Sequence, residues 1–157
     1  MYRHILVAVD GSITAERALD HAISLAKSEH AKLLAVYIVE YPSSIYSSAF
    51  IDVEPFHESM VNEAQTVLNK VQAKFRDAGV EGDVKMVDAG ALSGTIADQL
   101  RAAAGDAGVD LVVMGTHGRR GFQRLVLGSV AEAFVRQSNC PVMLVPHRED
   151  RAPAPGR

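Results

Sequence analysis

The sequence of 157 residues has one cysteine, no tryptophan and no long apolar run. The single cysteine, Cys140, cannot form a disulfide within the chain, and no other residues pair with it as a metal site. No run approaches the ~18 apolar residues of a membrane-spanning helix, and the N-terminus lacks the apolar segment of a signal peptide. We therefore predict a cytoplasmic protein without membrane insertion.

An excess of charge is also missing, since the formal net charge is only −3. This value gives no general attraction to nucleic acid or to an anionic membrane, so neither is a predicted partner. An apolar content of 48% indicates a globular protein, and the length suits one domain, which we place at residues 1–146. Residues 147–157 are charged, contain proline and are poor in apolar residues, which predicts a disordered tail.

Short apolar runs alternate with segments of helical periodicity throughout this domain. Residues 5–9 read ILVAV, a continuous run typical of a parallel strand that is covered on both faces, and residues 12–28 have helical spacing. The same patterns predict further strands at 33–39, 83–88, 111–114 and 142–145, and further helices at 57–78, 93–104 and 129–138. This alternation predicts an α/β fold, a single doubly wound (Rossmann-like) sheet of five parallel strands with four helices.

Three segments carry more specific predictions. Strand 83–88 is the most polar and alternates, which indicates an exposed face or an edge position. Ser93 is the predicted N-cap of the helix that follows it. Residues 40–56 mix aromatic, aliphatic, serine and proline residues without a clean period. A loop of this length in a compact domain is usually functional, so we interpret it as a lid or a partner surface.

The segment from Gly115 to Ser129 reads GTHGRRGFQRLVLGS and joins a predicted strand to a predicted helix. Glycines at 115, 118 and 121 allow positive φ and a close approach of the backbone to a ligand. Gly128 and Ser129 stand where the helix begins, so its free N–H groups and positive dipole end lie nearby. Such a convergence favours an anion, usually phosphate. The alternative is a purely structural glycine turn.

The spacing Gly115-x2-Gly118-x9-Gly128-Ser129 resembles the ATP-binding signature of the universal stress protein family. The resemblance covers nearly the whole chain, from HILVAVDGS near the start to CPVMLVP at residues 140–146. It implies an ATP-binding regulatory module of the stress response and the strand order 3-2-1-4-5. It also implies a homodimer, with further pairing to a tetramer as an open alternative. The joining strand is 142–145, an uncharged edge that needs a partner or a cover.

This strand order reverses between the strands that end at Asp10 and at Met114. Ligands of doubly wound sheets bind outside the carboxyl ends of the strands at such a reversal. Two independent features, the glycine segment and the reversal, therefore predict the same crevice. The predicted ATP-binding residues surround it; they are Ala8, Val9, Asp10, Val36, Met114, Gly115, Gly118, Arg119, Gly128, Ser129 and Val130.

Backbone amides are the predicted phosphate ligands, and they come from Gly118, Gly128, Ser129 and Val130. The Ser129 hydroxyl is an additional donor. Arg119 is either a phosphate partner, because a guanidinium matches phosphate oxygens, or a solvated loop charge.

The resemblance places the apolar slot for adenine at Ala8, Val9, Val36 and Met114. Asp10 either accepts hydrogen bonds from ribose hydroxyls, helps to bind Mg²⁺ or Mn²⁺ with the phosphates, or has only a turn or capping role. No general base stands out apart from Asp10 and His117, and we interpret His117 as a structural hydrogen-bonding residue. We therefore expect a binder with at most slow ATP hydrolysis.

Several other classes lack their motifs. There is no GxxxxGK[ST] of P-loop NTPases, no GxGxxG after the first strand, no paired histidines for zinc and no GxSxG nucleophile elbow. A phosphoacceptor signalling domain would use Asp10 and Asp88, but it also needs a second acidic residue beside Asp10 and a lysine after strand five. A dimeric interaction module of the same family that does not bind nucleotide is the remaining alternative, and the protein partner is unknown.

Overall fold

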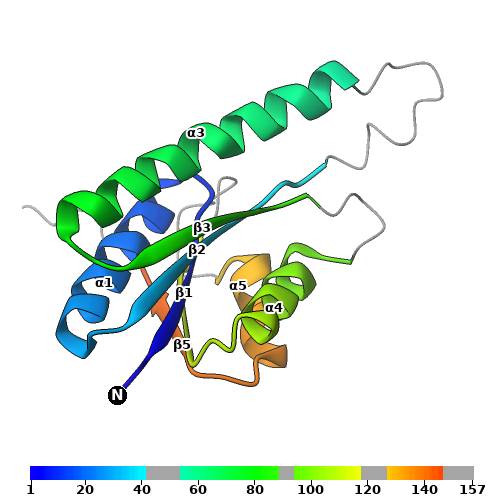
Figure 1. Cartoon of the computed structure of the whole chain (residues 1–157). Coiled ribbons are helices and arrows are strands. Elements are labelled where there is room, and N and C mark those ends of the chain that lie inside the picture. The colour runs from blue at the N-terminus through cyan, green and yellow to red at the C-terminus, as the bar shows by residue number, and fades with distance from the viewer. Residues whose placement is uncertain (42–53, 89–93, 118–126, 147–157) are drawn as a thin grey trace, which may run out of the picture.

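A computed structural model of the chain describes residues 1–41, 54–88, 94–117 and 127–146. Five strands form one parallel sheet in the order β3-β2-β1-β4-β5 (Figure 1). The strands are β1 (His4–Ala8), β2 (Lys32–Ile38), β3 (Gly82–Val87), β4 (Leu111–Gly115) and β5 (Val142–Val145). The helices of the described residues are α1 (Ile13–Glu29), α3 (Glu54–Ala78), α4 (Ile96–Asp106) and α5 (Ser129–Gln137). The predicted α/β sheet with the order 3-2-1-4-5 and four helices is confirmed.

The sheet separates two hydrophobic cores. Alternate residues of β1 enter opposite cores, because successive side chains of a strand point to opposite faces. Ile5 and Val7 pack with α1 and α3, whereas Leu6 packs with α4 and α5. Figure 1 shows the two pairs of helices on the two sides of the sheet. The central strand is therefore buried on both faces, as the continuous apolar run predicts.

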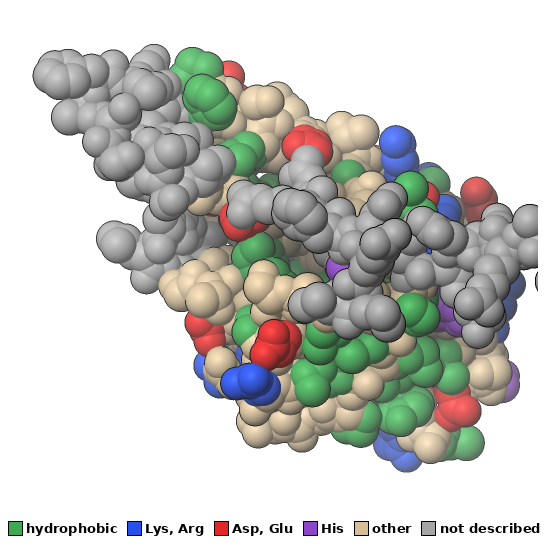
Figure 2. All heavy atoms as spheres, turned by 180° about the vertical axis from the view of Figure 1, so that it is seen from behind, with side chains coloured by type: hydrophobic (Ala, Val, Ile, Leu, Met, Phe, Trp, Pro, Cys, Tyr) green, Lys and Arg blue, Asp and Glu red, His purple; other side chains and the backbone are tan. Residues whose placement is uncertain are grey.

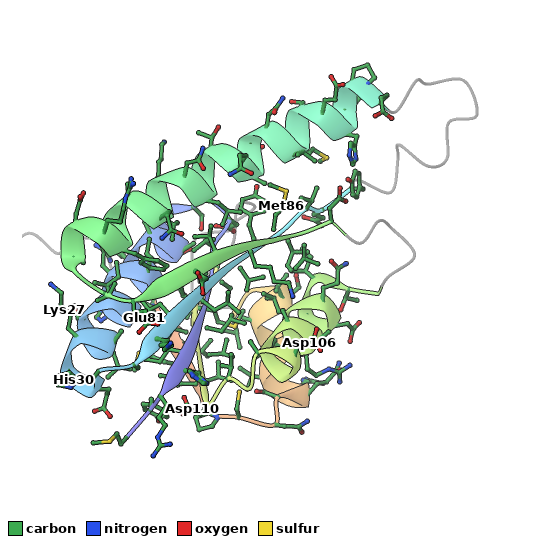
Figure 3. The ribbon with its side chains drawn as sticks, viewed as in Figure 1. Lys27, His30, Glu81, Met86, Asp106 and Asp110 are labelled. Atoms are coloured by element: carbon green, nitrogen blue, oxygen red, sulfur yellow. The ribbon has the colours of Figure 1, made fainter. Side chains whose placement is uncertain are left out.

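The amino-terminal end of β1 is tied to the chain before β4 through Asp110, which Figure 3 labels. Its carboxylate accepts hydrogen bonds from the backbone N–H groups of Arg3, at 2.8 Å, and His4, at 3.1 Å. Asp110 N–H in turn donates to the His4 carbonyl at 2.9 Å. These bonds fix one end of the central strand pair, at the opposite end of the strands from the predicted site.

The helix α4 corrects one predicted boundary. Its N-cap is Thr95, whose hydroxyl accepts the Asp98 N–H while the Asp98 carboxylate accepts the Thr95 N–H. This reciprocal capping box satisfies two backbone donors at once, which a serine two residues earlier would not do. Ser93, the predicted cap, lies outside the described residues. The Thr95 hydroxyl and backbone hydrogen bonds also lower the pKa of Asp98.

The helix α3 corrects a second predicted boundary. It begins at Glu54 and not at residue 57, with Pro55 in its first turn, where a missing N–H costs no intrahelical hydrogen bond. Residues 42–53 of the predicted lid or partner surface lie outside the described residues. Although α3 has 25 residues, no helix in the described part of the chain is long and apolar enough to cross a membrane.

The strand β3 occupies an edge of the sheet and is paired with β2, so its predicted edge position is confirmed. Half-buried and exposed positions alternate over its first residues. Met86, labelled in Figure 3, packs with the core under α3. Asp88 therefore lies two strands away from β1. Because neighbouring strands are about 4.8 Å apart, it cannot share a phosphoacceptor site with Asp10, and that alternative is wrong.

Candidate functional site

The carboxyl ends of β1 and β4 meet at the predicted reversal of strand order. Beyond β1, the Val9 N–H donates to the Val36 carbonyl of β2 at 3.0 Å. Beyond β4, the Thr116 N–H donates to the Val145 carbonyl of β5 at 3.0 Å. The two chain ends are thus drawn toward opposite neighbours, as expected at the reversal where such sheets bind ligands.

The helix α5 begins directly beside this reversal. Its N-cap, Gly128, supplies no side-chain cap, and the Gly128 N–H donates to the Thr116 carbonyl at 2.7 Å. Ser129 is exposed and Val130 is half-buried against the core under α4 and α5. The first-turn N–H groups of α5 are therefore held at the end of β4 without a capping side chain. This arrangement presents donors and the positive end of a helix dipole to an anion.

Two glycines allow the close contacts that hold this arrangement. A Cβ on Gly115 would lie 2.9 Å from Thr14 Cβ, and a Cβ on Gly128 would lie 3.0 Å from the Thr116 carbonyl oxygen. Neither residue has positive φ. The prediction of positive φ at Gly115 is therefore wrong, and the structure shows close packing against Thr14 instead, while the predicted close approach to a ligand stays a prediction. Gly118 and Gly121 lie outside the described residues, as does Arg119.

Asp10 has a clear local role. Its Oδ1 accepts the Ser12 N–H at 2.8 Å, the geometry of a turn in which the side chain replaces a backbone acceptor. Ser12 is the N-cap of α1 and accepts the Ala15 N–H at 3.2 Å. Asp10 is half-buried just beyond the end of β1, beside the predicted crevice. The turn role is thus observed, and the predicted ribose or metal role stays a prediction.

The predicted adenine slot is only partly assembled. Val36 and Met114 are 1% and 4% exposed and lie in the same core with the half-buried Ala8. Val9 packs into the opposite core, under α1 and α3. A base at this edge would therefore meet the small Ala8 side chain and backbone, because Val36 and Met114 offer little side-chain surface.

Thr14 and Thr116 make contacts with His117 that the sequence analysis did not predict. Thr14 donates a hydrogen bond to the His117 carbonyl, and Thr116 Oγ1 lies 3.0 Å from His117 Nδ1. His117 Nε2 is buried without a partner among the described residues. Thr14 lies one turn before Ala18 on the buried face of α1. A polar residue in a row of buried alanines was therefore the sequence feature that could have predicted a buried hydrogen bond at this position.

A metal ion would find few ligands in this crevice. The described residues contain no group of three or more histidine, cysteine, aspartate or glutamate side chains placed so that they could hold a metal ion. Near the crevice they offer the carboxylate of Asp10, which already accepts the Ser12 N–H.

A polar cluster stands apart from the crevice, at the ends of β2 and β3. Tyr41 donates to Asp88 Oδ1 at 2.6 Å, and its hydroxyl also lies 2.6 Å from His57 Nδ1. His57 Nε2 is 3.6 Å from Asp88 Oδ2, and its ring is stacked on Tyr41 with centroids 5.8 Å apart. These contacts join the first turns of α3 to the edge of the sheet.

The fold and the site define a class: a doubly wound α/β protein with a glycine segment and an uncapped helix N-terminus at its reversal of strand order. Within that class, the chain belongs to the universal stress protein family, whose family model matches residues 1–146. The chain is 34% identical over 145 residues to a universal stress protein of Methanocaldococcus jannaschii, covering 92% of this chain and 82% of that one.

Solved structures agree with this assignment. A universal stress protein family structure from Burkholderia pseudomallei has a TM-score of 0.77 and 36% identity, covering 93% of this chain and 97% of that one. A universal stress protein in complex with cAMP has a TM-score of 0.67 and 25% identity, with 92% and 97% covered. One from Archaeoglobus fulgidus in complex with dAMP has a TM-score of 0.66 and 25% identity, with 92% and 98% covered. Structural neighbours in the family thus bind adenine nucleotides.

Proposed function

We propose that this universal stress protein binds ATP in the crevice between β1 and β4 and acts as a nucleotide-dependent regulatory module of the stress response in the cytoplasm. One observation carries the proposal: the first turn of α5 is held by the 2.7 Å bond from Gly128 to Thr116, with no capping side chain. Helix N-termini of this kind favour phosphate. The adenine nucleotides bound by structural neighbours support the same ligand class.

The residues fit the phosphate end of ATP. The amides of Ser129 and Val130 belong to the first turn of α5, which has no capping side chain, and the exposed Ser129 can add its hydroxyl. Because a Cβ on Gly128 would meet the Thr116 carbonyl at 3.0 Å, glycine is needed for this close approach of the backbone. Gly118 and Arg119 complete the proposed phosphate contacts from the segment that follows His117.

The nucleoside end would lie over Ala8 and the chain after β1. Asp10 would accept hydrogen bonds from the ribose hydroxyls, and the base would meet mainly Ala8 and the backbone, with the buried Val36 and Met114 beneath them. Mg²⁺ or Mn²⁺ would enter with the phosphates.

Turnover is expected to be slow. A general base must reach the water that it activates. Asp10 already accepts the Ser12 N–H, and His117 Nδ1 lies 3.0 Å from the Thr116 hydroxyl. We therefore expect a binder and regulator. Phosphate release on the order of 1 per second or faster, a common rate for enzymes, would contradict this expectation.

The test is to identify nucleotide released from the purified protein and then to titrate ATP and AMP into the stripped protein. Gly118→Ala and Asp10→Ala should lose affinity, whereas Asp106→Ala, an exposed carboxylate at the end of α4, should not (Figure 3). If the wild type binds neither nucleotide, with or without Mg²⁺ or Mn²⁺, the proposal is wrong. The chain would then be better described as an interaction module of the same family.

We further propose a homodimer joined through β5. This strand is uncharged, pairs with β4 and forms an edge of the sheet. Val142, Met143 and Leu144 are half-buried, and Figure 2 shows hydrophobic side chains gathered on the rear of the molecule, where β5 lies behind β1 in Figure 1. A groove of about 530 Å³ runs between α1 and β5. Exposed edges of this kind need a partner.

Light scattering at micromolar concentration tests this assembly and separates a dimer from a tetramer. Leu144→Lys should give a monomer, because a lysine at the edge opposes pairing with a second strand. Lys85→Leu on the other edge strand, β3, is the control and should leave the assembly unchanged. A monomeric wild type would remove the proposal.

A further inference from the structure

The strongest unassigned feature is Thr14, in the first turn of α1. Its hydroxyl-bearing side chain is buried, at 6% exposure. Buried hydroxyl groups need hydrogen-bond partners, because an unpaired one loses its hydration without compensation. Thr14 finds its partner far away in the sequence: its hydroxyl donates to the carbonyl of His117, the residue two positions after β4.

The direction of the neighbouring hydrogen bonds follows from this contact. A carbonyl can only accept, so the single hydrogen of the Thr14 hydroxyl is used toward His117. Ser12 Oγ lies 3.2 Å from Thr14 Oγ1 and must therefore be the donor of that bond. The Ser12 N–H in turn donates to Asp10 Oδ1 at 2.8 Å. A directed series of hydrogen bonds thus joins the end of β1 to the chain that leaves β4.

The carbonyl that Thr14 binds belongs to the segment that positions α5. The adjacent residue, Thr116, accepts the Gly128 N–H at 2.7 Å and donates to Val145 at 3.0 Å. Thr14 also limits the space beside Gly115, where a Cβ would lie within about 3 Å of three Thr14 atoms. The first turn of α1 therefore touches the start of the glycine segment directly.

We infer that Thr14 is a positioning residue for the phosphate end of the crevice. It holds the His117 carbonyl and, through the adjoining Thr116, the N-terminus of α5 where the phosphates would bind. The inference rests on the proposed function, because the consequence is measured as nucleotide affinity. Thr14 is not assigned a contact with the nucleotide itself.

Two substitutions separate the hydroxyl from the shape of the side chain. Thr14→Val keeps the branched shape and removes the donor, whereas Thr14→Ser keeps the donor. Thr66→Val is the matched control, because the Thr66 hydroxyl is exposed and donates to the Asn62 carbonyl at 2.8 Å within α3. Each variant is titrated calorimetrically with ATP and with adenosine, and its melting temperature is recorded.

Thr14→Val should weaken ATP binding on the order of tenfold, because a carbonyl that positions the site loses its hydrogen bond. Adenosine has no phosphates, so its affinity should change less than about twofold by the same reasoning. Thr14→Ser should restore ATP binding to within about twofold, and Thr66→Val should match the wild type. A second readout is amide hydrogen exchange at Gly128, which should be faster in Thr14→Val without any ligand.

Three results would overturn the inference. The first is ATP binding by Thr14→Val that equals that of the wild type, and the second is an equal loss of ATP and adenosine affinity, which indicates a general structural effect. The third is a wild type that binds no nucleotide, which removes the proposed function as well and is recognised before any variant is made. If Thr14→Val does not fold, Thr14→Ala, which is smaller and cannot clash, replaces it in the same comparison.

Discussion

The contact between α3 and β3 gives the sharpest test of the packing, through the substitution Gly82→Ala. A Cβ on Gly82 would lie 2.7 Å from Phe75 Cδ2, 2.9 Å from Phe75 Cε2 and 3.1 Å from Leu33 Cβ. Phe75 is 1% exposed and Leu33 is 3% exposed, so neither side chain can move into solvent. The new methyl group must therefore displace α3 from the sheet or force Phe75 out of its rotamer.

Inserting a methyl group into a closed core of this kind costs about 1 to 3 kcal/mol. Gly105→Ala in α4 is the matched control, since a Cβ there meets nothing within 4 Å and alanine is the better helix former. It should raise the free energy of unfolding by up to about 1 kcal/mol. The same substitution, glycine to alanine, should therefore lower the free energy of unfolding at position 82 and raise it at position 105.

Urea unfolding at one fixed protein concentration measures both values, and the concentration is fixed because assembly would add to the apparent stability. With a urea dependence of about 1 to 3 kcal/mol/M, a loss of ~2 kcal/mol lowers the midpoint by roughly 1 M. Phe75→Leu provides a further check, because Gly82→Ala should cost less in its presence than alone. If the Gly82→Ala variant is as stable as the wild type, then Phe75 of α3 does not pack as closely against Gly82 of β3 as the structure shows.

Two further predictions concern the ends of elements. Asp110→Ala removes the acceptor for the N–H groups of Arg3 and His4, so we expect a loss of about 1 to 3 kcal/mol in urea unfolding, and Asp110→Asn should recover part of it. Hydrogen bonds from Thr95 lower the folded-state pKa of Asp98 below its ordinary value of 3.8. The corresponding stability is therefore present above that value and lost as pH falls through the lowered pKa. Asp98→Asn should flatten this acid limb in unfolding curves recorded from pH 5 to pH 2, and an unchanged slope would contradict the capping box.

The strands were predictable because their apolar runs are continuous. Strand 142–145 coincides with β5, and strands 33–39 and 83–88 differ from β2 and β3 by one residue at each end. Apolar periodicity reports which face is buried, and both cores bury the faces that it indicates.

The helix starts were less predictable, because they depend on local hydrogen bonds. Ser93 and Thr95 are both suitable cap residues, and only Thr95 has an acidic residue three positions later. The start of α3 was missed because Pro55 and Phe56 interrupt the period, although proline is well suited to a first turn.

The location of the candidate site in the fold was predictable from the sequence. The physical reason for one of its glycines was not. The position of Gly115, Gly128 and Ser129 at the reversal follows from the glycine spacing together with the order of the strands. The reason for glycine at position 115 does not, because it lies in a contact with Thr14, about a hundred residues earlier in the chain. A contact of that kind is created by the sheet order, which brings the start of α1 beside the end of β4.

The two ends of the proposed nucleotide site differ in the interactions that hold them in place. The base end would rest on Ala8 and the backbone around it, which cover the buried Val36 and Met114 in a core that forms without any ligand. The phosphate end depends on a few hydrogen bonds among Ser12, Thr14 and the chain around Thr116, each of which contributes about 1 kcal/mol. Small changes there should therefore alter affinity for the phosphates while affinity for the nucleoside stays nearly constant.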